Sequence, residues 1–183
     1  GDRIVWFLLL LMLDWTAFQT PPSAVQKDYI LDCIDNSIQY VAAFCGIQSG
    51  KSYVEADGAY AALYGPNPLM LDEDVRGRQP SEVWIVSKSY SLAETMLDTF
   101  RIRTPDDIWA TDRDMRTWGV TKGDRYTHWL RPRDNCEDHA PIKLRVRTAS
   151  DPESLRATNK LLRVKADELA HWKPMAWTNL QGH

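Results

Sequence analysis

The chain has 183 residues, of which 44% are hydrophobic and 26% are charged, as is ordinary for one soluble globular domain with a full core. The apolar stretch 4–13 is only about ten residues long and is followed by Asp14, so it is too short to span a bilayer. No small-residue cleavage site of a signal peptide is clear, and residues 1–20 are expected to form a helical segment that is buried or lies at an interface.

The net charge of −3 is unevenly spread along the chain. Residues 1–100 carry 6 Lys and Arg against 13 Asp and Glu, whereas residues 101–183 carry 16 against 12. The basic second half permits contact with a polyanion, although a solvated surface of mixed charge fits the counts equally well. The three cysteines give no disulfide framework and fit a reducing compartment.

The first predicted elements after the N-terminal segment are helical. Pro21 and Pro22 break the chain, and Ser23 is a candidate N-cap for a helix that runs to about Asp35. Gln26 stands about twenty residues before a glycine-rich loop, and its amide can pair a donor and an acceptor with the edge of an adenine base. A surface glutamine in the first turn of the helix is the alternative.

The glycine-rich loop is the stretch on which the functional prediction depends. An apolar strand over 40–44 leads into Cys45-Gly46-Ile47-Gln48-Ser49-Gly50-Lys51-Ser52, and a helix follows to Tyr64. Strand, glycine loop, Lys-Ser and helix form the context of a P-loop, in which backbone amides surround a phosphate. Lys51 would reach the β- and γ-phosphates of a nucleotide, and Ser52 would hold Mg²⁺. The usual pattern has glycine where Cys45 stands, so an ordinary strand-to-helix turn is the competing interpretation.

A polar loop, 66–80, is expected to connect this helix to a second buried strand, 82–87. Ser91 and Glu94 then match a capping box that opens a helix to about Arg103. A strand is predicted over 126–130, and the stretch 142–147 alternates apolar and basic residues, as in a hairpin or an edge strand. Its basic face is a candidate phosphate contact, with solubilising charge as the alternative: Arg131, Arg133, Lys143, Arg145 and Arg147.

The last predicted strand, 161–166, leads into Asp167 and Glu168. In a P-loop enzyme the first carboxylate binds Mg²⁺, and the second orients or deprotonates the attacking water. Strands alternating with helices predict one α/β domain over 21–183, with a mainly parallel central sheet flanked by helices. Arg163 and Lys165 are unusual in a strand expected to be central. A solvated Asp-Glu turn is the alternative.

Three segments together resemble the N-terminal ATPase domain of the large terminase subunit of tailed bacteriophages. They are 43–52, Ser154-Leu155-Arg156-Ala157 and Ala166-Asp167-Glu168-Leu169-Ala170. In that family the P-loop ends Gln-x-Gly-Lys-Ser/Thr, which accommodates Cys45. The resemblance covers about residues 20–180 and implies a RecA/ASCE-like P-loop NTPase fold.

The resemblance implies ATP hydrolysis with Mg²⁺, which drives double-stranded DNA into a preformed capsid in the host cytoplasm. The implied partners are the portal protein, the small terminase subunit and further copies of the chain in a ring. Lys51, Arg156 and Glu168 would act in catalysis, and Ser52 and Asp167 would hold the metal. The nucleotide would contact the following residues: Gln26, Gly46, Ile47, Gln48, Ser49, Gly50, Lys51 and Ser52.

Several positions depart from the family pattern. Ile47 stands where the family usually has an arginine, so Arg156 or a neighbouring subunit would have to supply that positive charge. Ala157 replaces a glycine, and we expect slow hydrolysis. The family's nuclease domain and its coupling motif have no counterpart here, which predicts a fragment of the whole subunit. A superfamily 2-type helicase, another DNA-dependent ATPase, and a nucleotide-binding module without turnover are the alternative interpretations.

Overall fold

The computed structural model describes six stretches of the chain: 22–35, 50–64, 80–132, 141–156, 161–167 and 172–181. The chain divides into two compact units. The first comprises 1–71 and 99–105, and the second comprises 72–98 and 106–183. The predicted segment 1–20, the strand 40–44 and nearly all of the loop 66–80 lie outside the described residues.

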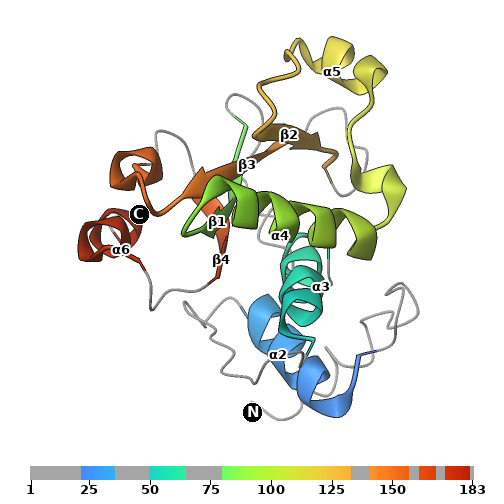
Figure 1. Ribbon diagram of the computed structural model, residues 1–183. Coiled ribbons are helices and arrows are strands. Elements are labelled where there is room, and N and C mark those ends of the chain that lie inside the picture. Colours follow the sequence, from blue (N-terminus) through green and yellow to red (C-terminus); the bar gives the residue numbers. More distant parts are fainter. Residues whose placement is uncertain are drawn as a thin grey trace. The chain divides into compact units, whose positions relative to one another are not determined.

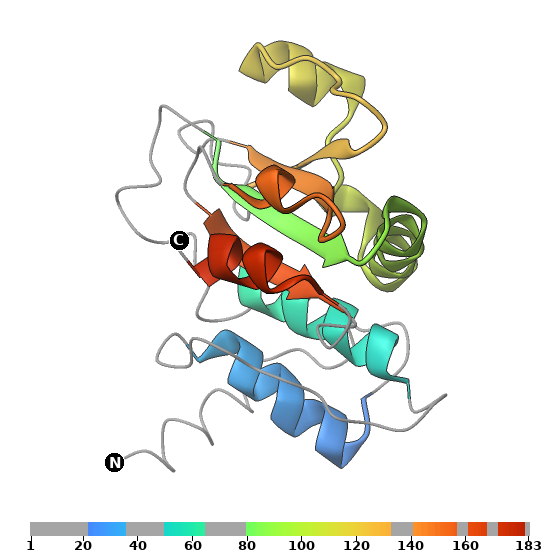
Figure 2. The same cartoon turned by 60° about the vertical axis from the view of Figure 1, so that its left-hand side comes forward.

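Two helices form the described body of the first unit, and they run side by side in Figures 1 and 2. Helix α2 spans Ala24–Ile34 and helix α3 spans Lys51–Tyr64, where the sequence predicted them. Ser23 caps α2 as expected, since its side chain accepts a hydrogen bond from the backbone of Gln26. The two helices bury a shared apolar cluster of Ile30, Leu31, Ile34, Val54 and Ala61.

A glycine sets the close approach of these two helices. A Cβ atom at Gly58 of α3 would stand 2.8 Å from the Cys33 sulfur and 3.1 Å from the Tyr29 ring. Real Cβ atoms do not approach other heavy atoms so closely. The glycine therefore lets α2 pack directly on the backbone of α3, the helix that begins with Lys51 and Ser52.

A buried ion pair fastens the other side of α3. The guanidinium of Arg103 donates from Nε to Oδ1 of Asp57 at 2.9 Å and from a terminal nitrogen to Oδ2 at 2.6 Å. The two side chains are only 5% and 3% exposed, so the charges compensate each other away from water. Arg103 also lies 5.4 Å from the centre of the Tyr53 ring. Because Asp57 and Tyr53 both belong to α3, Arg103 holds this helix at two points.

The second unit is built on a four-stranded sheet with the order β2-β3-β1-β4. The strands are β1 (Glu82–Ser87), β2 (Thr127–Leu130), β3 (Ile142–Thr148) and β4 (Leu161–Ala166). Strand β1 pairs in parallel with β3 and β4, and of the four described strands only β2 is antiparallel. The predicted α/β fold with a mainly parallel sheet is therefore confirmed.

Two of the strands carry basic residues, and their places in the sheet differ in part from those expected. Strand β3 forms the predicted hairpin with β2 but is not an edge strand, because β1 pairs along its other side. Strand β4, expected to be central, ends the described part of the sheet. Its Lys165 is nonetheless only 5% exposed.

Helices and short turns complete the second unit. Helix α4 spans Tyr90–Arg103, and its residues up to 98 belong to this unit, whereas residues 99–103 belong to the first. Helix α6 spans Pro174–Gln181. The 3₁₀ turns are η4 (Asp106–Ile108) and η5 (Pro152–Leu155). Helix α6 and η5 cover one face of the sheet, as Figure 2 shows for α6, with this cluster between them: Trp84, Val86, Ala149, Leu155, Trp172 and Ala176.

The predicted cap of α4 was wrong by two residues. The side chain of Ser89, and not that of Ser91, accepts the hydrogen bond from the backbone of Leu92. Ser91 lies inside the first turn, where its carbonyl accepts from Thr95. Glu94, the expected partner in a capping box, instead forms an ion pair with Arg125 at 3.1 Å.

Helix α5 (Asp112–Trp118) is set apart from the sheet in Figure 1 and buries none of its residues. Thr111 and Asp114 form a capping box at its start, and Gly119 ends it in the left-handed conformation. Arg131 fastens it to β2 through an ion pair with Asp114 at 2.8 Å. No helix in the described stretches is both long enough and apolar enough to cross a membrane.

Candidate nucleotide-binding site

Gly50 adopts the backbone conformation expected of the last glycine in a phosphate-binding loop. Its φ angle is +76°, which is strained for residues with a side chain. Its carbonyl accepts hydrogen bonds from the backbone of Tyr53 and Val54, both at 3.1 Å, and so begins α3. Lys51 and Ser52 are the first residues of that helix. The start of a helix carries positive potential, which favours a phosphate.

Gln26 lies beside this glycine. A Cβ atom at Gly50 would be 3.2 Å from Nε2 of Gln26, so the amide group faces the loop closely. Its Oε1 accepts a hydrogen bond from the backbone of Ser23 at 2.8 Å. Gln26 is half-buried and belongs to the capping box in the first turn of α2. Its role in reading adenine stays a prediction.

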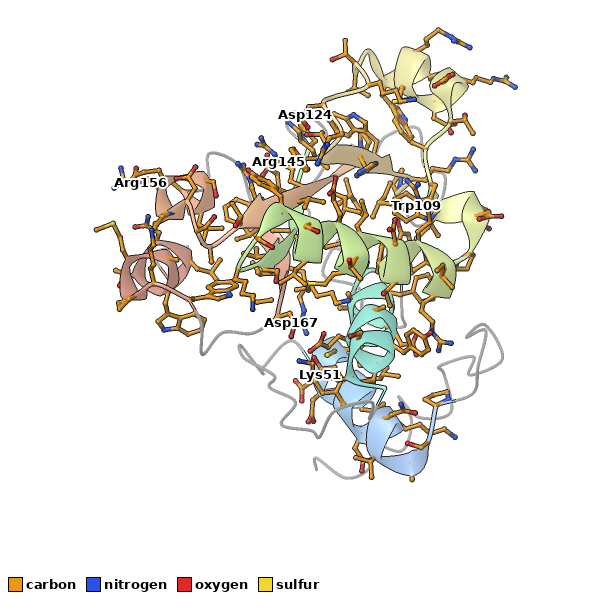
Figure 3. The ribbon with its side chains drawn as sticks, in the orientation of Figure 1. Lys51, Trp109, Asp124, Arg145, Arg156 and Asp167 are labelled. Carbon is orange, nitrogen blue, oxygen red and sulfur yellow. The ribbon has the colours of Figure 1, made fainter. Side chains whose placement is uncertain are left out.

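Asp167 follows β4 directly. Its backbone N–H donates to the Val86 carbonyl at 3.0 Å, and its own carbonyl accepts from the Trp172 indole at 3.0 Å. These two bonds fix the backbone at the carboxyl end of the strand, where ligands of parallel sheets gather. Figure 3 shows Asp167 at this end of β4.

Each of the two residues predicted to hold Mg²⁺ carries an oxygen donor of a suitable kind. Carboxylate and hydroxyl oxygens, such as those of Asp167 and Ser52, are the hard ligands that Mg²⁺ prefers. The described stretches contain no group of three or more His, Cys, Asp or Glu that could hold a metal. Mg²⁺ in nucleotide sites is commonly held by one or two carboxylates and by the substrate phosphates, so no larger acidic cluster is needed.

Arg156, the candidate source of positive charge, directly follows the turn η5. Its guanidinium forms an ion pair with Glu153 at 3.1 Å, and its side chain is 66% exposed. Figure 3 shows it on the outer side of η5. An exposed pair of this kind is weak and is easily exchanged for another anion.

The alternating basic side chains of β3 lie on one face of the sheet and stack on aromatic rings. Lys143 is 5.7 Å from the centre of the Trp129 ring, and Arg147 is 5.0 Å from that of Trp84. Arg145 pairs at 3.6 Å with Glu82, which is only 1% exposed. Burial, together with the nearby Arg145, lowers the pKa of Arg147. Arg133 lies outside the described residues.

The predicted site residues that the structure describes are divided between the two units. Gln26, Gly50, Lys51 and Ser52 belong to the first unit, and Arg156 and Asp167 belong to the second. Five predicted site residues lie outside the described stretches: Gly46, Ile47, Gln48, Ser49 and Glu168.

Sequence reasoning missed one polar group near Asp167. Ser87, the last residue of β1, is fully buried, and its hydroxyl has no hydrogen-bond partner in the described part of the chain. The available signal was its position, because the carboxyl ends of neighbouring parallel strands share one edge of a sheet.

Comparison with known proteins supports the fold. No protein-family model matches the sequence, and no curated protein matches it. The structure is similar to that of the large terminase ATPase domain of Thermus phage P74-26, with a TM-score of 0.52 and 21% sequence identity. The match covers 100% of this chain and 63% of that chain. The resemblance expected from the motifs is therefore confirmed at the level of architecture: this chain has the fold of the ATPase domain of a phage large terminase.

Proposed function

We propose that this chain is the ATPase part of a phage DNA-packaging motor, which hydrolyses ATP with Mg²⁺ to move double-stranded DNA into a capsid. The observation that carries the proposal is Gly50 in a left-handed conformation immediately before Lys51 and Ser52 at the start of α3. The fold shared with a terminase ATPase domain adds to it.

Each residue has a defined task in this proposal. The amides around Gly50 and the Lys51 ammonium bind the phosphates, and Gln26 contacts the base. Ser52 and Asp167 hold Mg²⁺, which offsets charge on the phosphates. Glu168 orients the attacking water and accepts its proton. Arg156 supplies the positive charge that Ile47 does not, within one subunit or to a neighbour.

The basic face of β3 is the proposed contact with double-stranded DNA. Its Lys143, Arg145 and Arg147 side chains are half-buried and spaced along one strand, so they present charge at fixed intervals. Phosphate contacts of this kind give an affinity that falls steeply with salt. The portal protein, the small terminase subunit and a ring of copies in the host cytoplasm complete the proposed motor.

ATP turnover with and without double-stranded DNA, measured beside binding of a fluorescent ATP analogue, tests the proposal. Lys51→Ala should abolish binding, whereas Lys27→Ala, a half-buried lysine on α2, serves as the matched control and should bind normally. Glu168→Gln should bind the analogue without turning over ATP. Turnover by Glu168→Gln at the parent rate would show that this residue has another role. Binding without any turnover by the parent would favour a nucleotide-binding module instead.

A further inference from the structure

Ser87 carries a buried polar group that no contact among the described residues accounts for. It is 0% exposed, and its hydroxyl has no hydrogen-bond partner in the described stretches. A buried hydroxyl without a partner costs free energy, because it has lost its bonds to water without replacement. Such a group therefore calls for a specific explanation, such as a ligand that completes it.

The position of Ser87 in the sheet points to that ligand. Ser87 pairs with Thr148 of β3, and the preceding residue, Val86, pairs with Ala166 of β4. Asp167 follows Ala166, and its N–H donates to the Val86 carbonyl at 3.0 Å. One further step in this register brings Ser87 next to Asp167, and residues paired in register lie on the same face of a sheet.

The other polar neighbour at this edge is already satisfied. The Thr148 hydroxyl donates to the Lys88 carbonyl at 3.0 Å and lies 2.9 Å from the Ser150 hydroxyl. Thr148 thus has a structural role that its own contacts explain. Ser87 differs from it, since among the described residues its hydroxyl has no partner at the strand end that carries the proposed metal-binding carboxylate.

We propose that Ser87 is a positioning residue of the Mg²⁺ site, whose hydroxyl donates a hydrogen bond to the Asp167 carboxylate in the nucleotide-bound state. This inference rests on the proposed function. A carboxylate that binds a metal through one oxygen can accept a hydrogen bond on the other, which fixes its orientation. Loss of such a supporting bond typically weakens metal binding by about 10- to 100-fold.

The test measures Mn²⁺ affinity by electron paramagnetic resonance, with the full chain and saturating ADP. Ser87→Ala should bind Mn²⁺ about tenfold more weakly than the parent. Ser87→Cys keeps nearly the same volume but is a weak donor, so it should show a similar loss. Ser81→Ala is the matched control, because Ser81 is a buried serine just before the other end of β1, and its affinity should stay within about twofold.

Thermal unfolding of the metal-free proteins gives the second measurement. The midpoint of Ser87→Ala should equal or exceed that of the parent, since the change removes a hydroxyl that bonds nothing there. The assignment of Ser87 would be overturned if both Ser87 variants bound Mn²⁺ as tightly as the parent, or if Ser81→Ala lost as much affinity as they do. Neither outcome would affect the proposed function. A parent protein that binds no Mn²⁺ with ADP would overturn the proposed function, and this inference with it.

Discussion

The buried pair of Asp57 and Arg103 gives the most direct test of what holds α3 in place. Arg103→Met keeps much of the side-chain stem but removes the guanidinium, so the Asp57 carboxylate loses a bidentate partner at 2.6 and 2.9 Å. Because the carboxylate is only 3% exposed, water does not replace those bonds readily. Removing one member of a buried pair costs about 3–5 kcal/mol.

Urea unfolding followed by tryptophan fluorescence measures this loss. Thermal unfolding gives a second measure: for a chain of this size, a loss of about 3 kcal/mol lowers the midpoint temperature of unfolding by about 6–12 °C. Glu94→Gln is the control on α4, the helix that also carries Arg103. The side chains of Glu94 and Arg125 are 35% and 68% exposed, so their ion pair should contribute less than about 1 kcal/mol.

A double variant tests whether the loss in Arg103→Met comes from the buried charge that it leaves on Asp57. Asp57→Leu combined with Arg103→Met leaves no buried charge, so it should be less destabilised than Arg103→Met alone. Equal losses in Arg103→Met and in Glu94→Gln would refute the reasoning, because the burial of Asp57 would then have no energetic consequence.

Three further changes test other parts of the structure. Gly58→Ala should destabilise by about 1–3 kcal/mol in urea, because its methyl group meets the Cys33 sulfur at 2.8 Å. Burial alone would raise the pKa of Asp114, but hydrogen bonds from Thr111 and Arg131 lower it to about 2. A lowered pKa stabilises above the unfolded value of about 3.9, so Asp114→Asn should cost about 1 kcal/mol at pH 7. That difference should vanish between about pH 4 and pH 2 in thermal melts. Ile47→Arg should speed ATP hydrolysis, and an unchanged rate would count against a missing arginine.

Local patterns in the sequence predicted most elements of the fold. The glycine loop followed by apolar periodicity gave α3, and Ser23 with Gln26 gave the start of α2. All four described strands were predicted within one residue of their bounds, because each is a short run of apolar or alternating residues between turns. These features depend on neighbours a few residues away, which the sequence displays directly.

Contacts between distant residues account for the failures. The cap of α4 was misplaced because Ser91 and Glu94 fit a local pattern, while Glu94 in fact pairs with Arg125, 31 residues away. Strand β3 has the buried face and the half-exposed basic face that its alternation predicted, but the alternative of an edge strand was wrong. In the structure Arg147 and Lys143 lie over tryptophan rings of the neighbouring strands, which lets an internal strand carry them.

The candidate site was predictable to a similar extent. The requirement for glycine at position 50 follows from the loop pattern, and the φ angle of +76° agrees with it. Gln26 was singled out from its place about twenty residues before the loop and from the family resemblance, but its closeness to Gly50 depends on the packing of α2. Ser87 belongs to no motif. Its proposed role depends on a buried hydroxyl without a hydrogen-bond partner among the described residues and on strand register, and a single sequence reveals neither.

Helix α5 has a practical consequence for experiments on this protein. Since none of its residues is buried, hydrogen bonds at its ends and the contact with Arg131 maintain it without help from the core. Such a segment opens locally at little cost, so its amides should exchange with solvent early. A fluorescent probe attached at the exposed Arg113 or Thr117 would leave the sheet undisturbed and would provide a handle for single-molecule recordings.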